Sequence, residues 1–207
     1  SLSQRGSLVA ETPDTVVSPA TYAAARLASG AVIQAVDAVM QNNASNAFCL
    51  HRPPGHHAER SQAMGFCYFN HIAVGARHLL EAHGLDRVAI VDWDVHHGNG
   101  TQHTFEDSAE VFFFSIHQAP HWPFTGASNE KGSGPGLNTT LNFPVSAGSG
   151  STEYFTAFDD VLWPALEKFN PDFILLSAGF DAHRNDPLGN INLREADFST
   201  LTDKIMH

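Results

Sequence analysis

Cysteine is scarce in this sequence of 207 residues. Cys49 and Cys67 are its two cysteines, and they do not form a Cys-x-x-Cys motif. The chain therefore has neither a disulfide framework nor a zinc site made of thiolates. This use of cysteine favours a reducing compartment.

Basic residues and long apolar runs are also lacking. Lys and Arg number 11 against 22 Asp and Glu, and the formal net charge is −11. This charge excludes a protein held mainly by the phosphates of nucleic acid or anionic lipid, and it suits a cationic partner. No uninterrupted apolar run approaches the roughly 18 residues of a membrane helix, and residues 1–11 lack the apolar region of a secretory signal. We therefore expect a cytoplasmic protein without direct nucleic-acid or membrane contacts, and the sequence leaves open whether it forms a homo-oligomer.

Apolar residues and histidine are plentiful. Hydrophobic residues make up 43% of the chain and charged residues 16%, which predicts a globular protein with a substantial core. The length favours one domain over residues 1–207. The sequence starts without Met and stops inside an expected helix that begins near Glu195, so we expect the domain to be incomplete at both ends.

Helix and strand signals alternate along the chain. Ser18 and Pro19 suit the start of a helix that runs to about Met40. Two more helices are expected over residues 70–83 and 151–169, with a kink or restart at Pro164 in the latter. Strand signals occur at residues 47–50, 87–91, 111–116, 139–145 and 173–178. Several of these segments are continuous apolar runs, which are typical of parallel strands buried on both faces. The alternation predicts an α/β fold with a mainly parallel sheet flanked by helices.

Polar side chains follow the predicted strands at the ends where parallel sheets bind ligands. Asp92, Asp94 and His96 follow one strand, and Asp181 follows another. In extended backbone Asp92, Asp94 and His96 would point to one side. Two carboxylates buried there without a cation would repel each other and lose hydration. Asp94, His96 and Asp181 are therefore candidate ligands of a catalytic zinc ion, which takes three protein ligands and a water.

The alternative for these residues is a hydrogen-bonded polar strand end without a metal. The histidine pair His56-His57 argues against it, because a rigid Pro-Pro-Gly loop carries two bases that the fold does not need. Isolated histidines are instead expected to be surface residues or satisfied core residues. This second group contains His51, His71, His78, His83, His103 and His121.

Four motifs resemble the histone deacetylase family of the arginase–deacetylase superfamily. They are Arg52-Pro-Pro-Gly-His-His-Ala58, Gly65-Phe-Cys-Tyr-Phe-Asn70, Asp92-Trp-Asp-Val-His-His-Gly-Asn-Gly-Thr-Gln102 and Ala178-Gly-Phe-Asp-Ala-His183. The resemblance extends from about Asp14 to Leu193. Trp93 and Asn99 are similar to the class II branch and its bacterial relatives, which include deacetylases and acetylpolyamine amidohydrolases. The resemblance implies the arginase–deacetylase α/β fold.

The resemblance also implies roles for individual residues. Asp94, His96 and Asp181 become the zinc ligands. His56 and His57 become a tandem catalytic pair, with Asp92 behind His56 and Asn99 behind His57. A carboxylate raises the pKa of a histidine, whereas an amide only orients it, so the two imidazoles would differ in basicity.

Further sites are implied around this centre. The family binds a monovalent cation, K⁺, and the residue types that bind it stand at Asp92, Asp94, His96 and Ser115. Gly65 and Phe66 are assigned to substrate binding, and Phe66 and Phe124 match the walls of a substrate tunnel. Asp14 matches a carboxylate at its rim. Alternatives remain open. Phe66 and Phe124 could be ordinary core residues, and the role of Asp14 rests on only a short motif.

One departure concerns the transition state. The family usually has a Gly-Gly-Tyr segment whose Tyr hydroxyl steadies the oxyanion, and this sequence ends before it. Loss of one such donor typically slows a reaction about 10²- to 10³-fold.

The sequence predicts a zinc-dependent amidohydrolase that removes acetyl or related acyl groups from lysine side chains of proteins or from acetylated polyamines. One alternative is a catalytically weak module that binds acetyl-lysine. Another is a ureohydrolase with two manganese ions, which is disfavoured because Gly98 stands where that site requires an Asp.

Overall fold

The computed structural model describes residues 9–12 and 14–206. Most of residues 1–11, where no secretory signal is expected, lies outside the described residues. The chain divides into two compact units. The first contains the chain up to Asp86 together with Asn99–Thr104, and the second contains Arg87–Gly98 and the chain from Phe105 onward.

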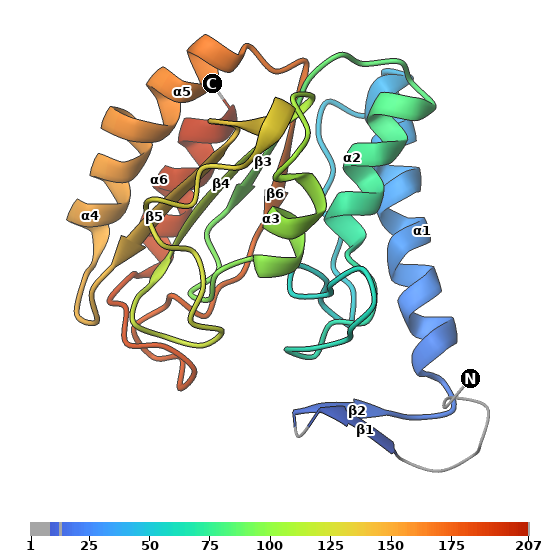
Figure 1. Ribbon diagram of the computed structural model, residues 1–207, viewed down its shortest axis with the longest axis horizontal. Coiled ribbons are helices and arrows are strands. Elements are labelled where there is room, and N and C mark those ends of the chain that lie inside the picture. The colour runs from blue at the N-terminus through green and yellow to red at the C-terminus, as the bar shows by residue number, and fades with distance from the viewer. Residues whose placement is uncertain (1–8, 13, 207) are drawn as a thin grey trace. The chain divides into compact units, whose positions relative to one another are not determined.

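Two helices that lie side by side form the body of the first unit (Figure 1). They are α1 (Thr21–Met40) and α2 (His71–Glu81). The side chain of Asn70 caps α2 by accepting a hydrogen bond from the N–H of Ala73 at 3.1 Å. The predicted start of the first helix at Ser18 is too early, because Ser18 lies in a turn that precedes Thr21.

Smaller elements of the first unit differ from the sequence-based expectation. A hairpin of β1 (Val9–Thr12) and β2 (Thr15–Val17) and a short helix α3 (Asn99–Phe105) were not predicted. The strand predicted at residues 47–50 is wrong, since this segment is irregular and Phe48 and Leu50 are 70% and 90% exposed. Its apolar residues signalled a buried strand, but the structure gives them no neighbouring strand.

Within the described ranges, α1 is the one helix that is long and apolar enough to cross a membrane by length and composition. An 18-residue window in it has a mean hydropathy of 1.3, and 17% of that window is buried. This result does not contradict the sequence-based expectation, which concerned uninterrupted apolar runs. Polar residues such as Arg26 and Ser29 interrupt the apolar residues of α1, so the sequence contains no continuous apolar run of this length. The buried residues Ala25, Ala28 and Val36 are small, as close packing of helices requires.

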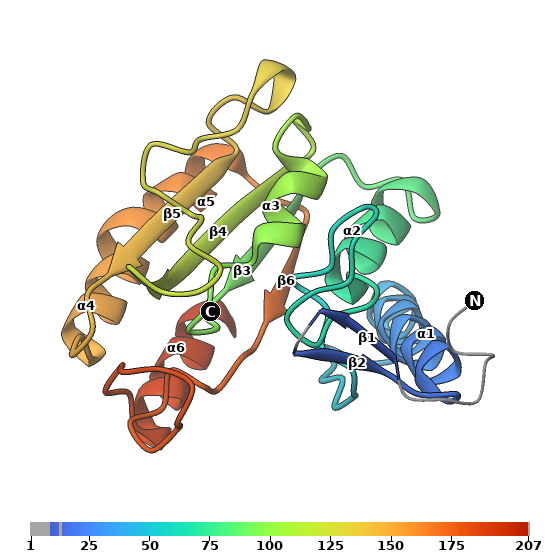
Figure 2. The same ribbon diagram turned by 60° about the horizontal axis from the view of Figure 1, so that its bottom comes forward.

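A parallel sheet of four strands forms the centre of the second unit (Figure 2). Its strands, in spatial order, are β5 (Thr140–Val145), β4 (Val111–Gln118), β3 (Val88–Asp92) and β6 (Phe173–Ser177). All residues of β3 and β4 are buried, which explains their continuous apolar sequences. This sheet confirms the predicted α/β class, and it places all four of these strands within three residues of their predicted ends.

The strand order reverses next to β3. The chain runs from β3 outward to β4 and β5, and then returns to the other side of β3 with β6. Asp92 at the end of β3 is in register with Ser115 of β4 and with Ser177 of β6. Ligands of open α/β sheets bind beyond the carboxyl ends of strands at such a reversal.

Helices of the second unit pack on this sheet through one apolar core. These are α4 (Ser151–Thr156), the π-helical segment η3 (Ala157–Leu162), α5 (Trp163–Phe169) and α6 (Glu195–Met206). Trp93, Phe114 and Phe158 are buried at the centre of the core. The predicted irregularity near Pro164 takes the form of a π-helical turn that precedes it. A wider turn there accommodates a residue that has no N–H and would clash with the carbonyl four residues before it.

Candidate functional site

Three candidate metal ligands converge in the second unit at the reversal in strand order. Asp94 and His96 follow β3, and Asp181 follows β6. Nδ1 of His96 lies 3.0 Å from Oδ1 of Asp94 and 3.0 Å from Oδ2 of Asp181. The three side chains are only 14–16% exposed. One oxygen, one nitrogen and another oxygen are thus close enough to share one cation.

The backbone reaches this arrangement by turning instead of staying extended, so the predicted alternation beyond Asp92 is wrong. The N–H of Asp94 donates to the carboxylate of Asp92 at 3.2 Å, and that of His96 donates to Asp94 at 2.8 Å. Short polar side chains favour such local turns. The N–H of Val95 donates to Asp181 at 2.9 Å, which connects the two segments.

Gly179 provides the space for one of these carboxylates, a role that the sequence analysis missed. A Cβ at this position would clash with the Asp94 side chain, lying 2.5 Å from its Cγ and 2.6 Å from its Cβ. Only glycine therefore lets the segment after β6 approach Asp94 this closely. The glycine before Phe180-Asp181 is visible in the sequence, but the sequence alone does not show that Gly179 packs against Asp94.

The charges of the cluster perturb each other. Burial lowers the pKa of His96, but its hydrogen bonds to Asp181 and Asp94 outweigh burial and raise the pKa to about 10. Burial and the charge of Asp94 raise the pKa of Asp181. Two carboxylates that disfavour each other's ionised form make a site that a cation stabilises.

Aromatic side chains cover the imidazole of this cluster. The ring of His121 stacks on that of His96 with centroids 4.9 Å apart, and Trp122 lies against it at 6.0 Å. His121 was predicted to be a surface or core residue without a role, whereas the structure places it against a candidate ligand. Its Nε2 also lies 2.9 Å from the carbonyl oxygen of Leu188, which holds the ring in place.

The residues expected around a monovalent cation lie next to this cluster. Asp92 and Ser115 are fully buried and are in register on neighbouring strands. The hydroxyl of Ser115 lies 2.9 Å from Nδ1 of His117, and Nε2 of His117 lies 3.0 Å from the carbonyl oxygen of Gly126. Because that carbonyl can only accept, Nε2 carries the proton and the Ser115 hydroxyl donates to Nδ1. Burial lowers the pKa of His117 to about 4, so the ring is neutral.

The histidine pair lies in the first unit. The rings of His56 and His57 are buried, with centroids 3.8 Å apart. Nδ1 of His57 lies 2.8 Å from Oδ1 of Asn99, so this predicted pairing is present. The amide oxygen accepts, which places the proton of neutral His57 on Nδ1 and its basic lone pair on Nε2.

The orientation of the Asn99 amide depends on Glu59, which the sequence analysis missed. Nδ2 of Asn99 donates to Oε1 of Glu59 at 2.5 Å, and the same oxygen lies 2.8 Å from Nδ1 of His103. A carboxylate accepts and does not donate, so it fixes which side of the amide faces His57. No motif of residue types revealed this contact between positions 40 apart.

Two glycines allow the loop of the histidine pair to pack closely within the first unit. A Cβ on Gly55 would lie 2.8 Å from the backbone nitrogen of His71. A Cβ on Gly100 would clash with the carbonyl of Ala58. Asp92, the predicted partner of His56, belongs to the second unit, and that pairing stays a prediction.

Two of the predicted substrate-binding residues, Asp14 and Phe66, line one cavity of about 340 Å³ in the first unit. Phe66 is 49% exposed, and it and Gly65 have positive φ angles of 65° and 55°. Phe124, in the second unit, is 77% exposed with a φ of 65°. An interpretation of either Phe as an ordinary core residue is therefore wrong.

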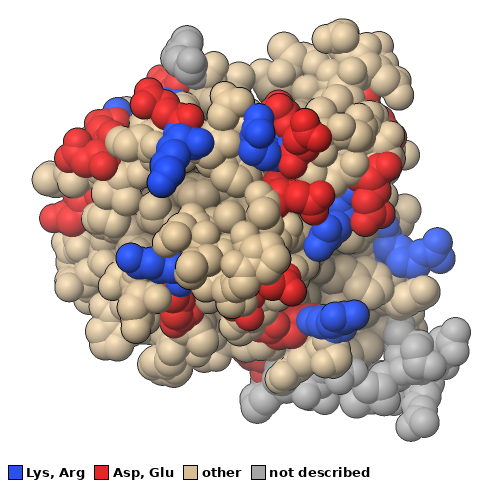
Figure 3. All heavy atoms as spheres, turned by 45° about the horizontal axis from the view of Figure 1, so that its top comes forward, with Lys and Arg blue, Asp and Glu red and all other residues tan. Residues whose placement is uncertain are grey.

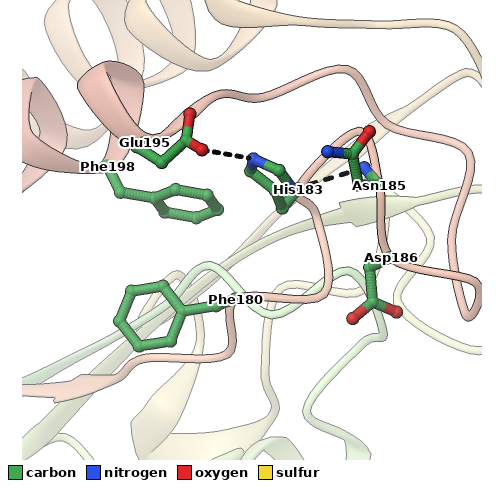
Figure 4. Close-up of a pocket in the computed structure, with 6 residues that line it drawn as sticks. All are labelled: Phe180, His183, Asn185, Asp186, Glu195 and Phe198. Atoms are coloured by element: carbon green, nitrogen blue, oxygen red, sulfur yellow. Dashed lines mark hydrogen bonds and ion pairs between the residues drawn. The ribbon is translucent and has the colours of Figure 1, made fainter.

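A larger cavity of about 520 Å³ lies in the second unit (Figure 4). Phe180 and Phe198 meet edge to face on one side with centroids 5.2 Å apart, and His183 faces Glu195 at 3.6 Å. None of the three candidate metal ligands lines this cavity. On the face of the molecule in Figure 3, acidic and basic side chains are interspersed.

A family profile described as the histone deacetylase domain matches residues 2–207, so the chain belongs to the histone deacetylase family. It is 45% identical over 190 residues to polyamine deacetylase HDAC10 of Homo sapiens, covering 89% of this chain and 28% of that protein. It is 42% identical over 191 residues to the histone deacetylase-like amidohydrolase of Pseudomonas aeruginosa, covering 91% and 50%. The crystal structure of the HDA15 HD domain matches with a TM-score of 0.94 and 42% identity, covering 98% of this chain and 58% of that chain.

These matches confirm the predicted family and fold. One domain profile spans both compact units. The chain spans less than two thirds of the length of each of these three relatives.

Proposed function

We propose that this chain provides the catalytic groups of a zinc-dependent deacetylase, a hydrolase that cleaves the amide between an acetyl group and a side-chain or polyamine nitrogen. The observation that carries the proposal is the convergence of Asp94, His96 and Asp181 at the reversal in strand order. Membership of the histone deacetylase family supports it, as do the relatives named for deacetylation and amidohydrolysis.

The donor set fits a zinc ion. Asp94 and Asp181 would each supply an oxygen and His96 a nitrogen, which leaves a coordination position open as in catalytic zinc sites. Burial and the charge of Asp94 raise the pKa of Asp181, and a divalent cation would favour its ionised form against both. When bound, zinc supplies Lewis-acid polarisation of the scissile carbonyl and of a water.

Proton transfer is the task we assign to the residues of the first unit. His57 carries its basic lone pair on Nε2 because Asn99 holds the proton on Nδ1. A histidine of the pair would take a proton from the attacking water, and a protonated histidine would deliver one to the departing amine. The amine needs that proton because an amide anion is a poor leaving group near neutral pH. In the proposal, Asp92 raises the basicity of His56, so the two rings differ in their readiness to hold a proton.

A monovalent cation, K⁺, is proposed beside the zinc ligands. Asp92 and Ser115 would contribute oxygen atoms together with Asp94 and His96. Donation of the Ser115 hydrogen to His117 leaves the lone pairs of the hydroxyl oxygen to face a cation. The cation would be structural, since it balances the charge of Asp92 in a fully buried place.

The substrate class is proposed from charge. A chain with a net charge of −11 suits a cationic substrate, either a lysine-rich acetylated protein or an acetylated polyamine. Asp14 lies in the same cavity as Phe66, an arrangement suited to an apolar stem with a cationic end. HDAC10 is named as a polyamine deacetylase, which makes the polyamine a substrate to test directly.

The test measures hydrolysis of an acetyl-lysine peptide and of an acetylated polyamine by the intact protein, with each substrate alone and with both in competition. Turnover of at least one should stop with a chelator and return when zinc is restored. Asp181→Asn should lose the zinc held by Asp94, His96 and Asp181 and with it the activity, and His57→Ala should lower kcat about 10²- to 10⁴-fold, the range of general acid–base catalysis. Asp203→Asn, which neutralises an exposed carboxylate on α6, should retain both metal and activity. Metal-independent turnover would rule the proposal out.

The same experiment separates the two alternatives. Binding of acetyl-lysine peptide without turnover of either substrate would indicate a binding module. Two manganese ions per chain that are both lost in Asp181→Asn would indicate a ureohydrolase.

A further inference from the structure

A second cluster of ligand-type side chains lies in the first unit. Asp37 comes from α1, His78 from α2, and His83 from the turn that follows α2. Nε2 of His78 and Nε2 of His83 lie 2.7 Å and 2.8 Å from the same atom, Oδ1 of Asp37. None of the three belongs to the catalytic groups proposed above.

Local structure brings His83 back toward its own helix. α2 ends at Glu81, and Gly84 has a φ of 67°, in the left-handed region that glycine readily adopts. The N–H of Leu85 then donates to the carbonyl oxygen of Leu79 at 3.2 Å, which closes the turn. The rings of His78 and His83 meet edge to face with centroids 5.1 Å apart.

The donor atoms suit a transition metal. Two imidazole nitrogens and a carboxylate oxygen lie within 4.8 Å of one another, and this is the borderline N and O set that Zn²⁺, Cu²⁺ and Ni²⁺ accept. At metal–ligand distances near 2.1 Å, tetrahedral ligands are roughly 3.4 Å apart, so each nitrogen would need to withdraw from the oxygen by about 0.6 Å. Small side-chain rotations provide such a shift.

Access favours binding as well. The side chains of His78, His83 and Asp37 are 23%, 19% and 38% exposed, so an ion can enter from solvent and keep a water ligand. We propose that Asp37, His78 and His83 form a second, non-catalytic transition-metal site, taking Zn²⁺ or a similar ion, that connects α1 to the end of α2. This inference is independent of the proposed function.

The test counts zinc bound by the intact protein after complete removal of metal and retitration against a chromophoric chelator. The wild type should bind two equivalents, and the double variant His78→Gln/His83→Gln should bind one while keeping its deacetylase activity. Asp181→Asn should also bind one, at the second site. Glu81→Gln, which removes an exposed charge on the same helix, should bind two.

Co²⁺ substitution in Asp181→Asn gives a second readout, because tetrahedral Co²⁺ absorbs visible light and the signal should disappear when Asp37→Asn is added. Should the double variant fail to fold, as judged by circular dichroism, the single variant His83→Gln on the turn replaces it and should weaken the second equivalent at least 10-fold. A folded His78→Gln/His83→Gln variant that binds as much zinc as the wild type, or a Co²⁺ signal that survives Asp37→Asn in Asp181→Asn, would overturn the proposal and leave a hydrogen-bonded trio.

Discussion

Replacing Gly179 by alanine tests how the candidate zinc ligands are held. An added Cβ would lie 2.6 Å from Cβ of Asp94, whereas ordinary contacts begin at 3.4 Å. Asp94 must therefore move by about 0.8 Å, several times the ±0.2 Å tolerance of metal–ligand distances. Gly179 does not have a positive φ, so alanine meets no backbone strain there. We expect zinc affinity to fall about 100-fold, the upper end for changes to groups that orient metal ligands.

The assay measures zinc content after dialysis against a buffered free-zinc series, together with deacetylase activity and thermal unfolding. Gly30→Ala is the matched control, because Gly30 lies inside α1 with nothing within 4 Å of an added Cβ. It should leave zinc affinity unchanged and raise the free energy of unfolding by up to about 1 kcal/mol. If Gly179→Ala keeps wild-type zinc affinity and activity, the close approach to Asp94 does not position a ligand.

Three other predictions concern proton transfer, pH and the core. Glu59→Ala frees the Asn99 amide to rotate and should lower kcat about 10-fold with little change in KM, measured by steady-state kinetics. His117 has a folded-state pKa of about 4, below its ordinary 6.5, so the unfolded state binds more protons between these values. The free energy of unfolding should therefore fall by up to about 3 kcal/mol as the pH drops through that window. In urea unfolding of the metal-free protein, this decline with pH should be smaller for His117→Gln than for the wild type. Phe158→Ala should cost about 3–5 kcal/mol, because it removes a ring that packs on Trp93 and Phe114 in the core, and an unchanged denaturation midpoint would contradict this.

The sequence predicted the parts of the fold that depend on local composition. The strands at residues 88–92 and 111–118 are continuous apolar runs because both faces are buried, so pattern alone located them. Residues 47–50 have the same pattern, yet they form no strand, because a strand also requires a neighbour and composition does not specify one. The sequence predicted a kink or restart at Pro164 but not a π-helical turn, because the shape of the irregularity depends on packing over the preceding turn.

The site was predictable to the extent that its residues follow strand ends. Asp94, His96 and Asp181 could be grouped because parallel strands end at one edge of a sheet. Gly179 and Glu59 act through contacts with residues 85 and 40 positions away in the sequence, and such pairings follow only from the folded chain.

The outer edge of β6 has a consequence for handling the protein. In the part of the chain that the structure describes, β6 has β3 as its one strand neighbour, and all five of its residues are only half-buried. A row of backbone amides and carbonyls beside Phe173, Ile174, Leu175 and Leu176 is a template for intermolecular β-pairing. At high protein concentration the chain should therefore self-associate through that edge.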